Sequence, residues 1–180
     1  MWILIAVVVI VLLWIIVSYN SLVNKRNRVR EAYSQIDVQL KRRSSLIPNL
    51  VETVQGYAKH EKEVFEKVTE ARSALIGASG PKESAKANDQ LSGALKSLFA
   101  VAEAYPDLKA SDNFKELQEE ISDTETKVAA SRQFYNNNVL DFNNSIQMFP
   151  GSVYAGMFHF TSSEFFQATD SEKADIQVKF

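Results

Sequence analysis

The sequence predicts an all-α protein, with a single N-terminal transmembrane helix, an antiparallel up-and-down four-helix bundle and an irregular aromatic C-terminal tail. Three observations lead to this prediction. The chain opens with a continuous apolar run, its prolines and glycines are few and clustered, and apolar residues elsewhere recur at every third and fourth position. We therefore expect a transmembrane anchor at 1–19, the bundle at 20–149 and a tail that packs on the bundle at 150–180.

The apolar run covers residues 1–17, contains no charged side chain, and is flanked by Trp2 and Tyr19. About 18 helical residues span about 27 Å, close to the hydrocarbon thickness of a bilayer, and aromatic flanks are typical of a span. A cleaved signal peptide is the alternative. It would carry a positive N-terminal region and a small-residue cleavage site, and neither is present. We expect a retained anchor whose partner is the lipid bilayer.

Orientation follows from the basic flank Lys25, Arg26, Arg28 and Arg30, which lies on the C-terminal side of the run. The positive-inside rule keeps such a flank in the cytoplasm. The sequence thus predicts a single-pass protein of the cell membrane, with a short N-terminus outside and a cytoplasmic bundle. The absence of cysteine fits a reducing compartment without deciding the matter.

Bundle helices are expected at about 20–44, 46–77, 84–105 and 112–148. Ser45 can cap the second of them, which puts Pro48 in its first turn, where no intrahelical N–H bond is lost. The apolar spacing runs in phase through Pro48, however. Residues 20–77 therefore form either a hairpin, which we favour, or one kinked helix.

The later boundaries follow from breakers and caps. The cluster GASGP at 77–81 ends the second helix, Ser84 can start the third, and Tyr105-Pro106 closes it. Ser111 or Asp112 can cap the last helix, and Pro150 ends it. Every seventh residue of this last segment is aromatic or aliphatic, a period typical of coiled-coil packing: Phe114, Ile121, Val128, Tyr135, Phe142 and Phe149.

Several blocks resemble the LemA family, namely SQIDVQLKRR at 34–43, LIPNLVETVQGYAKHE at 46–61, LFAVAEAYPDLKA at 98–110 and NFKELQEEISDTE at 113–125. The resemblance extends over nearly the whole chain, the anchor included. It implies a single-pass membrane protein with a small external N-terminus and a four-helix bundle. It implies no single function, since some relatives resemble membrane-organising magnetosome proteins and others sit beside membrane peptidases.

Residues that carry chemistry are scarce. The chain has no cysteine and two histidines, His60 and His159, and it contains no phosphate-binding loop, nucleophile elbow or zinc-protease motif. We expect no catalytic residue, metal ligand or cofactor, and no enzymatic activity. A net charge of −2, from 20 basic and 22 acidic residues, gives no reason to expect a nucleic-acid partner.

Polar residues on or beside the apolar faces are the candidate site: Arg43, Glu61, Gln118, Glu125 and Arg132. They have three interpretations: solvated bundle edges, an interhelical network that fixes register, or a ligand or peptide site. In the network, Glu61 would pair with Arg132 or, second, with Arg43. The cluster Lys41–Arg43 is interpreted as a solvated helix end.

Two functions are compatible with these features. The first is a membrane-tethered interaction module, an adaptor or scaffold that organises partner proteins at the membrane. The alternative is a regulator that binds a ligand or peptide and acts on a neighbouring membrane enzyme such as a peptidase. A cavity lined by Glu61, Glu125 and Arg132 would favour the regulator, and an exposed apolar groove would favour the module. By helix count, the tail should return beside Lys25–Arg30 if the chain breaks near Ser45.

Overall fold

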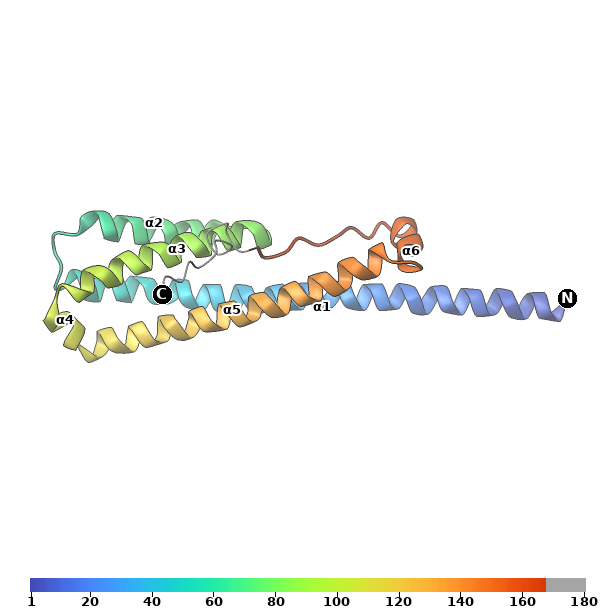
Figure 1. Ribbon diagram of the computed structural model, residues 1–180, viewed down its shortest axis with the longest axis horizontal. Coiled ribbons are helices and arrows are strands. Elements are labelled where there is room, and N and C mark those ends of the chain that lie inside the picture. Colours follow the sequence, from blue (N-terminus) through green and yellow to red (C-terminus); the bar gives the residue numbers. More distant parts are fainter. Residues whose placement is uncertain (168–180) are drawn as a thin grey trace, which may run out of the picture.

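A computed structural model describes residues 1–167, and this part of the chain is all-helical without strands. Figure 1 shows an elongated molecule in which the first helix extends far beyond the others at its N-terminal end. The helices are α1 (Trp2–Gln55), α2 (Lys62–Gly77), α3 (Gly80–Glu103), α4 (Pro106–Ala110), α5 (Asp112–Gln147) and α6 (Gly151–Met157).

The projecting part of α1 is the apolar run. Its most apolar window has a mean hydropathy of 2.9, and none of that window is buried against the protein. Among residues 1–167, α1 is the one helix long and apolar enough to cross a membrane. An exposed apolar helix thus lies where a span is expected, and it continues without interruption into the rest of the protein.

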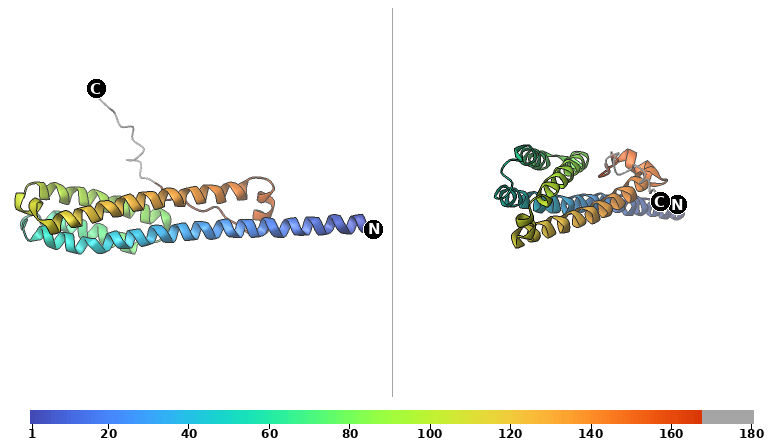
Figure 2. Two further views of the ribbon diagram at one scale, coloured as in Figure 1. Left: turned by 90° about the horizontal axis from the view of Figure 1, so that it is seen from below. Right: turned by 60° about the vertical axis from the view of Figure 1, so that its left-hand side comes forward.

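The long helices pack around the second half of α1. α5 lies along α1, while α2 and α3 lie side by side near the end of α1 that is far from the N-terminus (Figures 1 and 2). Arg42 is paired with Glu120, and Lys25 is paired with Asp141. Later residues of α5 thus meet earlier residues of α1, and α5 ends close to the apolar run.

The core follows the seven-residue spacing of both long helices. On α1, every seventh residue from Leu22 to Leu50 is buried, with Arg43 as the polar member of the series. On α5, the series from Phe114 to Phe142 is also buried. Burying each large apolar side chain contributes about 1.5–3 kcal/mol, so this seam is the main source of stability. Phe149 lies beyond α5 and is 82% exposed.

The expected break at Ser45 is wrong, because α1 passes through Ser45 and Pro48 and ends at Gln55. The Ser45 hydroxyl donates to the Arg42 carbonyl oxygen at 2.7 Å, as a serine inside a helix does, and caps nothing. The single kinked helix over 20–77 is wrong as well. The chain leaves the helix at Gly56, a poor helix former, and α2 begins at Lys62.

Pro48 is tolerated inside α1 because a side chain replaces the hydrogen bond that proline cannot make. A residue at position 48 would normally donate its N–H to the carbonyl of Ser44. The guanidinium of Arg72, on α2, donates Nε–H to that carbonyl oxygen at 2.9 Å. Since Ser44 is buried, this bond satisfies a carbonyl that would otherwise lack a donor.

The start of α3 also differs from the expectation. α3 begins at Gly80, which has a φ of +80° that favours glycine, and the Glu83 carboxylate accepts the N–H of Ser79 at 3.0 Å. Ser84 is therefore not a cap. It is buried inside α3, with its hydroxyl 3.2 Å from that of Tyr33.

Candidate functional site

Arg43 is the most buried charged side chain in the described part of the chain, with 1% of its surface exposed. Its Nη1 donates to Oδ1 of Asn88 at 2.7 Å, and its Nη2 lies 3.6 Å from Oε2 of Glu125. These contacts join α1, α3 and α5 in one polar layer. Burial lowers the pKa of Arg43, while the carboxylates of Glu125 and Asp89 oppose that shift. An arginine nevertheless keeps its charge in proteins.

A cavity of about 290 Å³ adjoins this layer, between α1, α3 and α5. Two buried polar atoms of its lining, Nε of Arg43 and Oδ2 of Asp89, have no hydrogen-bond partner within residues 1–167. Such groups favour polar occupants, since leaving them unpaired costs free energy. The charged residues that line the cavity are Arg43, Asp89, Lys96, Glu125 and Arg132.

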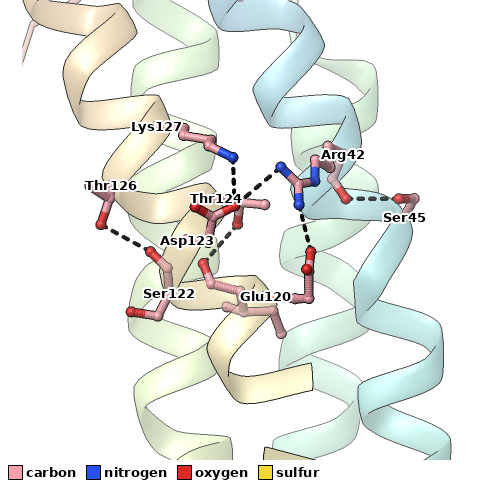
Figure 3. A network of polar contacts seen from close by, with 9 residues as sticks. Arg42, Ser45, Glu120, Ser122, Asp123, Thr124, Thr126 and Lys127 are labelled. Carbon is pink, nitrogen blue, oxygen red and sulfur yellow. Dashed lines mark hydrogen bonds and ion pairs between the residues drawn. The ribbon is translucent and has the colours of Figure 1, made fainter. Parts of the chain in front are cut away.

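A second polar network joins α1 to α5 next to the Arg43 layer, and Figure 3 shows it from close by. Arg42 pairs with Glu120 at 2.6 Å and with Asp123 at 3.2 Å, and Lys127 pairs with Asp123 at 2.8 Å. The hydrogen bond to Glu120 is the main cause that raises the pKa of Arg42, and the bond from Lys127 is the main cause that lowers the pKa of Asp123. The two pairs of Arg42 join α1 to α5, whereas Lys127–Asp123 lies within α5, and such half-exposed pairs contribute little to stability.

The structure brings three of the five candidate residues together, namely Arg43, Glu125 and Arg132, at the cavity. Glu61 lies elsewhere, because the helix ends at Gln55 and Glu61 becomes the residue before α2. There its Oε1 accepts a hydrogen bond from the Tyr105 hydroxyl at 3.0 Å, so the expected placement in a network with Arg132 is corrected. Gln118 is exposed on α5.

Two residues of these networks, Asn88 and Arg42, are not among the residues predicted from the sequence, although the sequence carries a signal for each. Asn88 lies in phase with Leu91, Leu95 and Leu98, so it is an amide on the apolar face of its helix. Arg42 belongs to the cluster interpreted as a solvated helix end. That interpretation is wrong for Arg42 and Arg43, because α1 continues past Ser45 and α5 covers them.

Residues 163–166, beyond α6, lie along α5. Asn143 makes two hydrogen bonds with the backbone of Ser163, at 2.8 and 2.9 Å, and Asn136 makes two with the backbone of Phe166, at 2.9 and 3.0 Å. Tyr135 donates its hydroxyl to the Glu164 carbonyl oxygen at 2.7 Å. Residues 168–180 of the predicted tail lie outside the described part of the chain.

This docking predicts a loss of stability at high pH. Burial is the main cause that raises the pKa of Tyr135 to about 12, whereas an unfolded tyrosine titrates near 10. Between about pH 10 and 12 the unfolded chain releases this proton and the folded chain keeps it, so the free energy of unfolding falls as pH rises. Urea unfolding across this range should show that fall for the native chain. Tyr135→Phe should reduce the fall of the free energy of unfolding with pH, whereas Tyr57→Phe, at an exposed position, should leave it unchanged. Equal falls in the two variants would contradict the assignment of this pH effect to Tyr135.

Among residues 1–167, no group of three or more histidine, aspartate or glutamate side chains is placed to hold a metal ion. The candidate site is therefore a polar cavity and two interhelical networks. The sequence profile of the LemA family matches residues 32–180, which include every residue of these networks. The chain belongs to the LemA family.

Individual proteins are also similar to this chain in sequence. Protein LemA of Metamycoplasma hominis is 31% identical over 163 residues, covering 88% of this chain and 73% of that protein. Magnetosome protein MamQ 2 of Paramagnetospirillum magneticum is 25% identical over 179 residues, covering 85% of this chain and 66% of that protein. Magnetosome protein MamQ of Magnetospirillum gryphiswaldense is 24% identical over 178 residues, with shares of 84% and 65%. The chain thus spans about two thirds of the length of the MamQ proteins. Family membership and the apolar helix together indicate a membrane-associated, LemA-like protein.

Proposed function

We propose that the protein is a membrane-tethered helical interaction module, which organises partner proteins at the membrane as an adaptor or scaffold. The observation that carries this proposal is the continuity of α1 from Trp2 to Gln55. A helix of 54 residues is about 80 Å long. Because no loop separates the apolar run from the packed part, the bilayer fixes the direction of the whole body. A rigid body held at a fixed orientation suits the assembly of other proteins.

The body is proposed to be an antiparallel four-helix bundle with coiled-coil-like packing, built from α1 beyond Tyr19 together with α2, α3 and α5. The pairs Arg42–Glu120 and Lys25–Asp141 support opposite directions for α1 and α5. The buried seven-residue series on both helices supports interdigitated packing. Such a bundle presents long helical faces to partners.

The outer face of α2 and α3 carries the surface that we assign to a partner helix. An open groove of about 400 Å³ lies there, lined by small residues together with Lys67, Glu70 and Gln90. Small side chains permit close approach of another helix, because its ridges can enter the groove. The small residues are Ala71, Ala74, Gly93, Ala94 and Ser97.

The body is proposed to lie in the cytoplasm, on the strength of the basic flank Lys25, Arg26, Arg28 and Arg30. A fluorescent reporter fused after Phe180 should therefore be bright in intact cells and resist protease added outside. Replacing the four basic residues with glutamine and adding three lysines before Trp2 should reverse this result. Cleavage of the native reporter from outside would contradict the orientation.

Proximity labelling in intact cells tests the module itself, with the labelling enzyme fused after Phe180. The control is the same enzyme fused to residues 1–30, which carries the anchor and flank without the body. The full chain should enrich a reproducible set of proteins over this control, and Ala74→Arg, which fills the groove, should lose that set. Equal sets from the full chain and the anchor alone would contradict a scaffold.

The second candidate, a ligand- or peptide-binding regulator of a neighbouring membrane enzyme, is favoured by the cavity at Arg43. Ala129 lines this cavity but not the groove, whereas Ala74 lines the groove but not the cavity. Ala129→Leu fills the cavity from an exposed position and serves as the matched variant. If Ala129→Leu changes the labelled set while Ala74→Arg does not, the regulator replaces the module as the account of function.

A further inference from the structure

The C-terminal end of α5 and the helix α6 expose an unusual number of large apolar side chains. Phe149 is 82% exposed, Met148 66%, Met157 64% and Val153 52%. They occupy one short stretch of chain, between the end of α5 and the start of the returning tail. Large apolar patches on soluble surfaces mark contacts with a protein or a membrane.

The position of this stretch identifies which contact it is. The Tyr154 ring on α6 packs against Trp14 with 5.4 Å between ring centroids, and the Phe158 ring packs against Tyr19 at 4.8 Å. Trp14 lies inside the apolar run, about 7.5 Å along the helix axis before Tyr19. α6 therefore lies level with the last turns of the expected span, as its place beside α1 in Figure 1 shows.

Local geometry holds α6 at this level. A Cβ at Gly151 would lie 1.9 Å from the carbonyl oxygen of Ser145, so only glycine allows the first turn of α6 to sit against the end of α5. Beyond α6, Phe160 is buried and its ring lies 5.0 Å from the guanidinium carbon of Arg26. The chain is thus fixed on both sides of the exposed apolar stretch.

Charges are distributed as a bilayer surface requires. Arg28 and Arg30 are exposed on α1, two to three turns beyond Tyr19. They lie on the side of α6 that faces away from the apolar run, where anionic headgroups would be attracted to them. Apolar side chains at one level and cations at the next are typical of a segment that lies in the membrane interface.

We propose that residues 148–158, with α6 at their centre, form a second membrane contact. In this contact the exposed apolar side chains enter the interfacial layer of the bilayer that α1 spans, and Arg28 and Arg30 meet the phosphates of anionic lipids. The proposal rests on the proposed membrane tether. It gives the body a second point of attachment, which restrains rotation about the axis of α1.

Spin labels on the full chain in vesicles of phosphatidylcholine and phosphatidylglycerol test this contact. The native chain has no cysteine, so single cysteines at Val153 and Met157 carry the label without background. Both residues are exposed, and their replacement leaves the core intact. Val9 in the apolar run is the lipid control, and exposed Ala100 at the far end of α3 is the water control. The readout is accessibility to oxygen, which concentrates in lipid, relative to a water-soluble nickel chelate.

We expect the oxygen-to-nickel ratio at Val153 and Met157 to exceed that at Ala100 by several-fold and to approach that at Val9. Water-like ratios at Val153 and Met157 with a lipid-like ratio at Val9 would overturn the second contact and leave the tether standing. Low accessibility to both reagents would overturn it in favour of a protein or a second copy covering the patch. A water-like ratio at Val9 would show that the tether has failed, and this proposal with it.

Discussion

Replacing Asn88 with alanine is expected to lower the free energy of unfolding by about 2 kcal/mol. Asn88 supplies the buried oxygen that accepts a hydrogen bond from Arg43, and a guanidinium with 1% exposure that loses this partner is left poorly compensated. Removing one partner of a buried charge is more costly than removing the charge together with its partner. Urea unfolding of the full chain in detergent micelles, followed by circular dichroism, measures the change.

The matched control is the double variant Arg43→Met/Asn88→Leu. It keeps the apolar stem of Arg43 and the branched skeleton of Asn88 but contains neither the buried charge nor the oxygen that it needs. The double variant should therefore be more stable than Asn88→Ala. Glu125→Gln should have a small effect, because Glu125 has a side-chain exposure of 57% and lies 3.6 Å from Arg43. If the changes in the free energy of unfolding caused by Arg43→Met and Asn88→Leu simply add, the two residues are not coupled. The contact between them would then not stabilise the protein.

Arg72→Met is the second substitution with a large expected effect, again about 2 kcal/mol of lost stability. The methionine keeps the apolar stem of the side chain but cannot donate to the buried carbonyl of Ser44. Lysine would also be a poor replacement for Arg72, because the Nε–H of arginine donates from a fixed planar group that lysine lacks. The same unfolding measurement applies.

Pro48→Ala provides the test of mechanism for Arg72. Alanine restores the backbone N–H that donates to the Ser44 carbonyl within α1, and it should raise the stability of the native chain. In this background, Arg72→Met should cost less than about 0.5 kcal/mol, the range of an ordinary surface change. An undiminished cost would mean that Arg72 stabilises the protein by contacts other than the one to Ser44.

The case of Pro48 also shows what the sequence could and could not predict. Helical class, the apolar run and the buried series on α5 follow from short-range periodicity, which is visible in the chain. The continuity of α1 does not, because it depends on a donor from Arg72, 24 residues further along. Local rules for serine and proline favoured a break at Ser45, and a tertiary contact overrides them.

Similar reasoning applies to the candidate site. Arg43, Glu125 and Arg132 could be predicted as a group, since each lies on or beside an apolar face of a long helix. Glu61 could not be placed, because the phase of the apolar spacing is lost when α1 ends at Gln55. The return of the tail to the basic flank was predicted for the wrong break. A break after Gln55 gives the same number of chain reversals as one at Ser45, and the Phe160 ring lies 5.0 Å from the guanidinium carbon of Arg26.

The central claim is that α1 runs through Ser45 and Pro48 without a break, and a single distance across them tests it. Spin labels on cysteines at Asn24 and Glu52, both exposed, would be measured by pulsed electron resonance in the full chain in lipid nanodiscs. A continuous α1 predicts a narrow distribution near 42 Å, at about 1.5 Å per residue. A chain that reverses at Ser45 would bring the labels to about 20 Å, and a distribution centred there would contradict the account.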